Sequence, residues 1–566
     1  MSDSHSQPNL LQISLSFILL QLFSKLLTFS LNQTLIRFTS PELLGTTSIQ
    51  FDVLSNSILF ITREHFRAHL SRLQIEFSHQ NLTKSRHQQI VNHCYLPIPI
   101  GFILSTISFS IYHHLTINNN SSLQHNFKLS LFIYYLSTLF EFISEPAYLY
   151  HLITAQTSPR IKVEAIAVFL KSFITLLIIY SGARLAKDWA LLAFSFGQLT
   201  FASCLLIGLW ISKHSIKTDK KFLPKWIIKK SILNSPLAKH DHPLGEHDFN
   251  LICALARQSI LKQFLSEGDK MIVGRLCPIA NQGSYALALN YGSLVARIIF
   301  QPIEESARLY FSKTLGPITN NHKPIQIKED SDKQVESSKE NLKEDQPNDH
   351  HLIRDEAITT LSALILFQSY LGLILITFVP SYIKPALILI LGPNSSYLSG
   401  HAIVINILKT YCNLLPLLAL NGILEAFVQS VANQKELKQM NSMMILWCIT
   451  YIGSIYLFKH LNEIGMIYSN CINMMFRILY SYHFIIQFLN HHQHKSSHSL
   501  LDIIPNPLMI LVFMIFNLVL RYYEKNYFND FIIRNHDHNK LMIDWNQFCS
   551  HLSIGIICFI TCLIIG

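Results

Sequence analysis

The stretch SLVARIIFQPIEES, at Ser293–Ser306, places charged side chains in a run that is otherwise apolar enough for a lipid bilayer. An ionisable side chain at membrane depth costs about 2.5–3.5 kcal/mol or more, so it normally faces a polar cavity or a partner. Five polar residues recur here at spacings of seven, four, three and four, which predicts one polar face of a membrane helix that lines a path for a polar molecule. They are Asn290, Arg297, Gln301, Glu304 and Arg308.

Positive charge also recurs in other apolar segments. An arginine presents a planar fork that grips phosphate with two hydrogen bonds, and a lysine adds a point charge. If the two halves of the chain pack face to face, these cations predict a cavity for a phosphate or diphosphate group, with acidic partners beside them. The predicted cavity cations are Lys25, Arg37, Arg63, Arg67, Lys262 and Arg297, and the acidic members are Glu267 and Glu304.

Other roles for the charged residues stay open. Arg63, Arg67 and Lys262 are also consistent with interfacial charges or with side chains that extend to the membrane surface. Three further glutamates in or near spans are consistent either with struts between helices or with substrate contacts. They are Glu141, Glu145 and Glu425.

The sequence holds no strong motif for enzyme chemistry, for a cofactor or for a metal. The chain lacks GxxxxGK[ST], HExxH and GxSxG motifs, which argues against ATP hydrolysis and against metal-dependent or serine hydrolysis. The Glu267–Asp269 ExD triplet is a weak signal for a metal-dependent sugar transferase, because no other carboxylate is close in sequence. A histidine group is better explained as a solvated loop than as a metal site, and the ten cysteines as core residues. The histidines are His491, His492, His494 and His498.

The elements that must position these residues are membrane helices. The chain has 566 residues, half of them hydrophobic and only 14% charged, with mean hydropathy +0.29. Apolar runs of about 20 residues recur, each long enough to cross the hydrocarbon core. This predicts an all-α membrane protein with fourteen spans, and segment 384–393 is a short interfacial or re-entrant piece. The spans are 10–36, 43–62, 92–112, 128–152, 163–182, 186–211, 250–273, 284–311, 353–380, 401–431, 441–459, 463–489, 505–523 and 548–566.

Loop charges predict the orientation of the chain. The net charge of +10 comes from basic loops such as 63–86 and 213–239, which indicates cytoplasmic loops rather than a nucleic-acid partner. This orientation places both termini in the cytoplasm, and the first span acts as an uncleaved anchor. Segment 314–350 is charged, nearly free of large apolar residues, and predicts a disordered linker. The glycosylation sequons at Asn119, Asn120 and Asn394 then face the lumen.

The two halves of the chain are weakly alike. QLFSK in the first span resembles QFLSE in the seventh, and Phe60 and Glu64 resemble Phe300 and Glu304, with both offsets near 240 residues. Internal repeats with the substrate site between them are typical of secondary transporters. The predicted domains are an N-terminal six-helix lobe at 1–212, a basic cytoplasmic loop at 213–249, a C-terminal six-helix lobe at 250–489, and two additional helices at 490–566.

Six blocks of this sequence resemble the eukaryotic oligosaccharide-diphosphodolichol flippase family of the endoplasmic reticulum. The block at 291–306, in the predicted eighth span, is the most specific. The linker at 314–350 and the last hundred residues match the family poorly. The blocks are LLQLFSKLLTFSLNQTLIRF (19–38), ILFITREHFRAHL (58–70), SEPAYLYHLITAQTSPRIKVEAIA (144–167), QFLSEGDKMIV (263–273), YGSLVARIIFQPIEES (291–306) and LKTYCNLLPLLALNGILEAF (408–427).

The resemblance implies more than the residues do. The family is similar to the multidrug, oligosaccharidyl-lipid and polysaccharide exporter superfamily, which pairs two six-helix lobes around a central cavity. It implies movement of a lipid-linked five-mannose, two-N-acetylglucosamine oligosaccharide from the cytoplasmic to the lumenal leaflet, in a multi-pass protein of the endoplasmic reticulum membrane. The implied partners are that dolichol-linked substrate, membrane lipids and other N-glycosylation proteins. The alternatives are a non-transporting scaffold or chaperone of the glycosylation machinery and a dolichol-dependent transferase. By resemblance, the cavity residues are Lys25, Arg37, Arg63, Arg67, Arg297 and Glu267.

Overall fold

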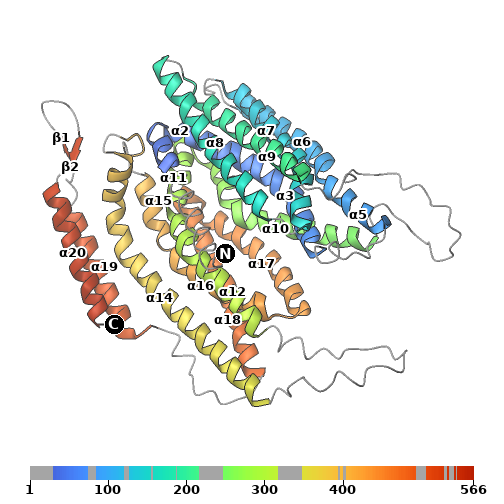
Figure 1. Cartoon of the computed structure of the whole chain (residues 1–566). Helices are drawn as coiled ribbons and strands as arrows, with labels where there is room; N and C mark the ends of the chain where they lie inside the picture. The colour runs from blue at the N-terminus through green and yellow to red at the C-terminus, as the bar shows by residue number, and fades with distance from the viewer. Residues whose placement is uncertain are drawn as a thin grey trace, which may run out of the picture. The chain divides into compact units, whose positions relative to one another are not determined.

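The computed structural model shows an all-helical protein with one short β-hairpin (Figure 1). Several predicted features lie outside the residues it describes: Lys25 and most of the first span, most of the 213–239 loop and the 314–350 linker, and the side chains of the 491–498 histidines. The described residues are 30–73, 84–119, 126–154, 157–185, 188–215, 246–315, 347–392, 395–398, 403–491, 505–527, 532–534, 541–543 and 545–565.

The chain divides into two compact units, and the division falls inside helix α11, between Gly283 and Ser284. In the first unit α7, α8 and α9 pack side by side, α6 lies against α7, and α10 packs along α3 (Figure 1). The predicted seventh span, α10, therefore belongs to the first compact unit. The elements are α2 (Pro41–Leu44), η1 (Gly45–Phe51, a π-helix), α3 (Asp52–Arg72), α5 (Lys84–Tyr95), α6 (Pro97–Asn119), α7 (Phe127–Ile153), α8 (Thr157–Arg184), α9 (Ala190–Ser215), α10 (Glu246–Leu276) and the start of α11 (Ile279–Val295).

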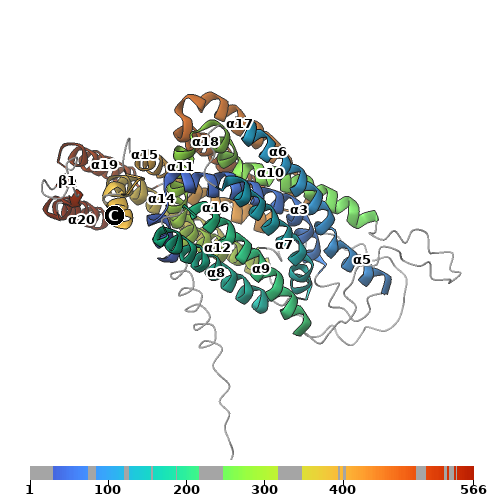
Figure 2. The same ribbon diagram turned by 90° about the horizontal axis from the view of Figure 1, so that it is seen from above.

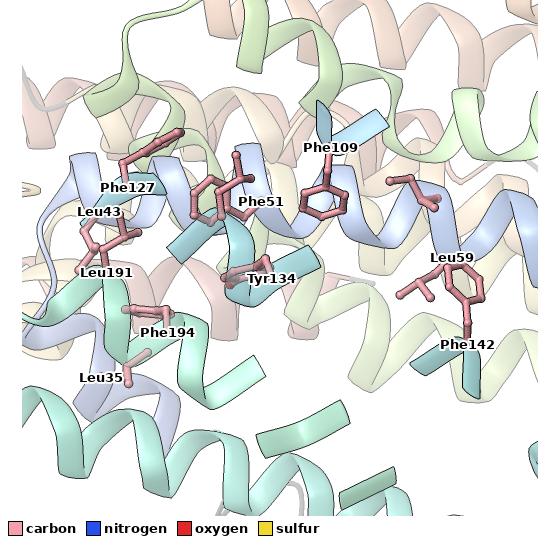
Figure 3. Close-up of a cluster of buried hydrophobic side chains, with 12 residues drawn as sticks. Leu35, Leu43, Phe51, Leu59, Phe109, Phe127, Tyr134, Phe142, Leu191 and Phe194 are labelled. Atoms are coloured by element: carbon pink, nitrogen blue, oxygen red, sulfur yellow. The ribbon is translucent and has the colours of Figure 1, made fainter. Parts of the chain in front are cut away.

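The core of the first unit follows α2, η1 and α3 (Figure 3). Phe51, at the end of η1, is fully buried, and its ring centroid lies 5.0 Å from that of Tyr134 and 5.3 Å from that of Phe127. Leu59 and Phe142 belong to the same buried cluster and lie at its other end from Phe127 (Figure 3). Because lipid tails are as apolar as these side chains, close packing rather than exclusion of water from apolar surface holds such helices together.

Polar contacts fix α10 and the start of α11 on this core. The Gln263 amide donates to Ser57 Oγ at 3.0 Å, which ties α10 to α3. The Gln50 amide donates to Gln282 Oε1 at 3.1 Å and its own Oε1 accepts from Tyr112 at 2.7 Å. These bonds connect α10, α11 and α6 with η1 and α3 at buried or half-buried positions, as polar side chains commonly do between membrane helices.

Gly45 and Gly283 allow a close crossing of η1 and α11. A Cβ atom on Gly283 would lie 1.8 Å from the carbonyl oxygen of Pro41, and one on Gly45 would lie 2.2 Å from that of Ile279. We expect Gly283→Ala to lower the free energy of unfolding by about 1–3 kcal/mol, because rigid backbone atoms must separate. Thermal unfolding of the purified protein in detergent measures this change. Gly453→Ala is the control, since a Cβ there meets nothing within 4 Å; equal unfolding temperatures for the two variants would contradict the tight crossing.

The second unit is a bundle around α14, α16 and α18 with two further helices beside it. Helix α17 begins with a capping box in which the side chains of Asn433 and Glu436 bond each other's backbone N–H groups. The elements are the rest of α11, η2 (Ala296–Phe300, a π-helix), α12 (Gln301–Thr314), α14 (Pro347–Leu391), α15 (Ile403–Tyr411), α16 (Leu415–Val431), α17 (Gln434–Phe458), η3 (Lys459–Leu461), α18 (Asn462–His491), α19 (Pro507–Tyr527), β1 (Ile532–Arg534), β2 (Leu541–Ile543) and α20 (Trp545–Ile565).

Helices α19 and α20 lie beside α14, joined by the antiparallel β1–β2 hairpin (Figures 1 and 2). The Asn517 amide donates to the carbonyl of Ile376 at 2.9 Å, and the Tyr382 hydroxyl donates to that of His551 at 2.8 Å. Segment 384–393 is not a separate interfacial or re-entrant piece as predicted. It continues α14 as far as Leu391, past Pro380 and Pro385, because membrane helices tolerate proline when neighbouring groups satisfy the freed backbone.

Nine stretches among the described residues are helical, long enough and apolar enough to cross a membrane. One of them, Lys438–Phe488, contains α17 and α18, which the sequence predicts as two spans. Many large apolar side chains on these helices are exposed, including Phe102 and Ile103 on α6, as lipid-facing surfaces require. The nine stretches are Arg86–Thr116, Phe127–Ile153, Ser158–Arg184, Ala190–Lys213, Ile279–Ser312, Asp355–Leu391, Ile403–Val431, Lys438–Phe488 and Pro507–Asn526.

Candidate functional site

In the first unit, two predicted cavity arginines pair with two glutamates. Arg67 on α3 binds Glu145 on α7 through two parallel hydrogen bonds, Nε to Oε1 at 2.6 Å and Nη2 to Oε2 at 2.7 Å. Arg63, one turn earlier, donates to Glu141 Oε2 at 3.1 Å and lies 3.8 Å from Glu145. The side chains of Glu141 and Glu145 are only 4% and 1% exposed. Each buried negative charge is therefore compensated by its arginine partner rather than by water.

Neighbouring side chains complete this cluster. The guanidinium carbon of Arg67 lies 3.8 Å from the centre of the Tyr148 ring. Burial lowers the pKa of Arg67, but the adjacent Glu145 carboxylate outweighs this effect and leaves the pKa above its ordinary value. Glu141 also accepts from the Gln198 amide at 3.1 Å, and Gln198 in turn accepts from Lys171 at 2.6 Å. The network thus joins α3, α7, α8 and α9, as inter-helix struts do.

The second unit holds a related cluster. Arg308 on α12 donates to Glu304 one turn earlier at 2.6 Å. Glu304 lies against α16, where a Cβ on Gly422 would be 3.0 Å from its Oε2. Glu425 on α16 accepts from Arg477 on α18, and also from two amides on its own helix. This cluster therefore contains two carboxylates and two arginines.

Counted along the predicted spans, both clusters fall on alternate helices. In the first unit the charged and amide groups come from α3, α7 and α9, the predicted second, fourth and sixth spans, with Lys171 added from α8. In the second unit they come from α12, α16 and α18, the predicted eighth, tenth and twelfth spans. Lys171, Gln198 and Arg477 were not predicted from the sequence. Each is a polar residue inside an apolar run, and that signal could have identified it.

Arg297 lies in a different environment from these paired arginines. It sits in η2, where its guanidinium donates to the backbone oxygen and to Oδ1 of Asn290, both at 3.2 Å, and its Nε lies 3.4 Å from the Ser293 carbonyl. The side chain is exposed, and it forms no ion pair with any described residue. Its positive charge is held in place by the dipoles of Asn290 and Ser293, and no carboxylate in the described part of the chain pairs with it.

The predicted polar stripe around Arg297 is divided into pairs. Arg297 contacts Asn290, seven residues earlier, while Gln301 donates to Glu305 at 2.9 Å and Glu304 pairs with Arg308. The π-helical turn at Ala296–Phe300 inserts an extra residue into the helix and rotates the residues that follow. A constant period of 3.6 residues therefore does not describe this face.

The other predicted site residues lie apart from these clusters or outside the described structure. Glu267 pairs with Lys270 at 2.7 Å, and Asp269 Oδ1 accepts from the Lys270 backbone, so both carboxylates of the ExD triplet contact one lysine residue. Lys262 on α10 and Arg37, just before α2, are exposed. Lys25 is outside the described residues.

This fold occurs in known membrane transporters. A solved structure titled "Lipid II flippase MurJ, inward closed conformation" superposes with a TM-score of 0.59 at 14% identity, covering 97% of this chain and 98% of that one. A multidrug resistance MATE family transporter of the MOP superfamily superposes with a TM-score of 0.51 at 11% identity, covering 82% of this chain and 95% of that one. These likenesses establish the fold.

Sequence relatives extend over most of the chain. A protein of Saccharomyces cerevisiae named Man(5)GlcNAc(2)-PP-dolichol translocation protein RFT1 is 32% identical over 504 residues, which is 83% of this chain and 81% of that protein. A Drosophila melanogaster protein of the same name is 24% identical and covers 97% of this chain and 93% of its own length. The sequence model of the Rft protein family matches residues 12–566. The chain therefore belongs to the Rft protein family, which confirms the resemblance seen in the sequence.

Proposed function

We propose that this chain moves Man(5)GlcNAc(2)-PP-dolichol from the cytoplasmic to the lumenal leaflet of the endoplasmic reticulum membrane. Relatives that match most of the chain are named as translocation proteins for this lipid, and not as enzymes. The observation in this chain that carries the proposal is Arg297: a cation inside a predicted membrane helix, exposed, oriented by Asn290 and not paired with a described carboxylate. A diphosphate supplies the matching negative charge and acceptor oxygens.

The physical problem in this reaction is to carry the diphosphate and sugar hydroxyls through hydrocarbon. Each polar group without a partner costs several kcal/mol there. A water-filled cavity with a small number of unpaired cations lowers this cost, while the dolichol chain stays in lipid. The buried ion pairs of Arg63 and Arg67 serve in this scheme to hold the helices that form the cavity wall.

We extend the proposal to the architecture: fourteen spans, with lobes at 1–212 and 250–489 that rock against each other and two helices outside them. Ion-pair clusters on corresponding helices of the two units support two repeats, and so do the π-helices η1 and η2 in the predicted second and eighth spans. In this scheme α10 is the first helix of the lobe at 250–489, and α3 is the second helix of the lobe at 1–212. Their packing is then a contact between the two proposed lobes.

The proposed orientation places both termini, the 213–239 loop and the 314–350 linker in the cytoplasm. Protease sites inserted at 216–245 and at 316–346 should be cut in intact microsomes, whereas a site inserted at 120–125 should be cut only after detergent is added. Immunoblotting of an epitope-tagged chain measures the fragments. Protection of both proposed cytoplasmic sites in sealed vesicles would require the opposite orientation.

Transport into sealed liposomes tests the function itself. Purified chain is reconstituted with labelled Man(5)GlcNAc(2)-PP-dolichol, and an added glycosidase that cannot cross the membrane reports how much lipid reaches the outer leaflet. We expect protein-dependent access to lipid that starts in the inner leaflet, with empty liposomes as the control. The alternative, a scaffold or chaperone for glycosylation proteins, predicts binding without movement. Transfer of a sugar between the dolichol-linked lipid and an added acceptor or donor would instead indicate a transferase.

A further inference from the structure

Three buried metal-ligating side chains meet at one end of the first unit. His69 near the end of α3, His93 in α5 and Asp248 near the start of α10 each offer one ligand atom, and these atoms all lie within 4.8 Å of one another. The residues are 1%, 0% and 4% exposed. The two imidazole rings meet edge to face, with centroids 5.4 Å apart. Residues far apart in the sequence are thus brought together from three helices.

The composition of the cluster indicates which ion fits. Two imidazoles with one carboxylate are typical of zinc and related transition metals, whereas calcium and magnesium prefer oxygen ligands alone. Neighbouring ligands of a tetrahedral zinc ion lie about 3.4 Å apart, as follows from bonds of about 2.1 Å. Ligand atoms already within 4.8 Å reach that spacing by small side-chain rotations. We propose that His69, His93 and Asp248 form a site for a zinc-like divalent metal ion, with a water molecule as the fourth ligand.

Arg86 supports the carboxylate of this site. It bonds Asp248 Oδ2 through Nη1, and its Nη2 lies 3.5 Å from Oδ1. A hydrogen-bonding partner behind a ligating group commonly fixes that group's orientation. The guanidinium charge also weakens cation binding, since it lies close to the same carboxylate. The site is accordingly expected to bind its metal reversibly.

The position of the site indicates a structural role. It joins the beginning of α10 to α3 and α5, at the ends of these helices that are predicted to be cytoplasmic. An ion that binds only the folded state stabilises it, and the stabilisation rises with the logarithm of the free metal concentration once that concentration exceeds the Kd. The metal therefore clamps α10 to α3 and α5, a role that is independent of whether the chain transports lipid.

Cobalt and zinc binding test the site directly. The chain is purified with a histidine-free tag, with His491, His492, His494 and His498 replaced by glutamine in every protein, and stripped with a chelator. We expect one Co²⁺ per chain with the visible absorption of a tetrahedral site, displacement by Zn²⁺, and a higher unfolding temperature with Zn²⁺. His93→Gln and, separately, Asp248→Asn should weaken Co²⁺ binding by more than the roughly 10–100-fold that follows loss of a supporting partner.

The control is His151→Gln, because His151 is a buried histidine of α7 outside the cluster. It should retain the cobalt spectrum and the effect of zinc. If a cluster variant fails to fold, the cobalt titration of the parent protein and its absorption spectrum still show whether the site binds metal. Absence of a tetrahedral cobalt spectrum in the folded parent protein, or an unchanged spectrum in folded His93→Gln, would overturn the proposal.

Discussion

Arg67→Ala should lower the free energy of unfolding by about 3–5 kcal/mol, the usual cost of removing one partner of a buried ion pair. Glu145 is 1% exposed and receives both of its short hydrogen bonds from this guanidinium. Without Arg67, its charge remains buried, and among the described ion pairs it keeps the longer contact with Arg63 at 3.8 Å. The expected readouts are a strong loss of folded protein in cells and a lower unfolding temperature in detergent.

A second substitution distinguishes a strut from a substrate contact. Arg67→Met combined with Glu145→Leu should restore most of the lost stability, because an apolar pair of similar size removes the uncompensated charge. Lys270→Ala is the control, since its pair with Glu267 is partly exposed and should contribute less than about 1 kcal/mol. If Arg67→Ala accumulates normally and loses only substrate binding, the arginine contacts the substrate and the strut assignment is wrong.

The sequence predicted the class of fold because its signals there are local. Runs of apolar residues long enough to span a bilayer predicted membrane helices, and nine helical stretches of the described residues are long and apolar enough to be such helices. Charges within or just beyond those runs drew attention to Arg63, Arg67 and Glu304. The sequence left Glu141 and Glu145 open as struts or substrate contacts, but it could not specify that their partners are Arg63 and Arg67, 78 residues earlier. The bond between Arg67 and Glu145 depends on how α3 and α7 pack, and one sequence does not specify that packing.

The two π-helical turns could not be predicted from the sequence either. GTTSIQF in η1 and ARIIF in η2 show no proline or other clear break, so periodicity alone predicts an uninterrupted α-helix. Gly45, the first residue of η1, lies at the close crossing with α11, which is a tertiary contact that local sequence does not reveal. The metal cluster was missed for a related reason: His69, His93 and Asp248 lie far apart in the sequence, so no local spacing motif exists.

Arg297 is singled out by the sequence as a cation in an apolar run, and the structure shows it exposed and without a described carboxylate partner. We expect Arg297→Ala to weaken binding of Man(5)GlcNAc(2)-PP-dolichol about ten- to hundredfold. This range corresponds to the roughly 1.5–3 kcal/mol of a hydrogen bond to a charged group. The protein should stay folded and abundant, because the hydrogen bonds that this substitution removes join Arg297 to Asn290 and Ser293, a short distance earlier in the chain. Binding to detergent-solubilised protein and transport in liposomes measure the effect.

Two variants separate the role of the charge from that of the guanidinium geometry. Arg297→Lys should recover only part of the binding, because an ammonium group keeps the charge but lacks the planar fork that matches phosphate. Arg308→Ala, in the following helix α12, is the matched control. The Arg308 guanidinium already pairs with Glu304 at 2.6 Å, so its loss should lower the stability of the protein more than its binding of the lipid. Normal glycosylation in cells that carry Arg297→Ala at normal abundance would exclude the phosphate role. The cation of η2 would then require another ligand, and the proposed cavity would have to be built around different residues.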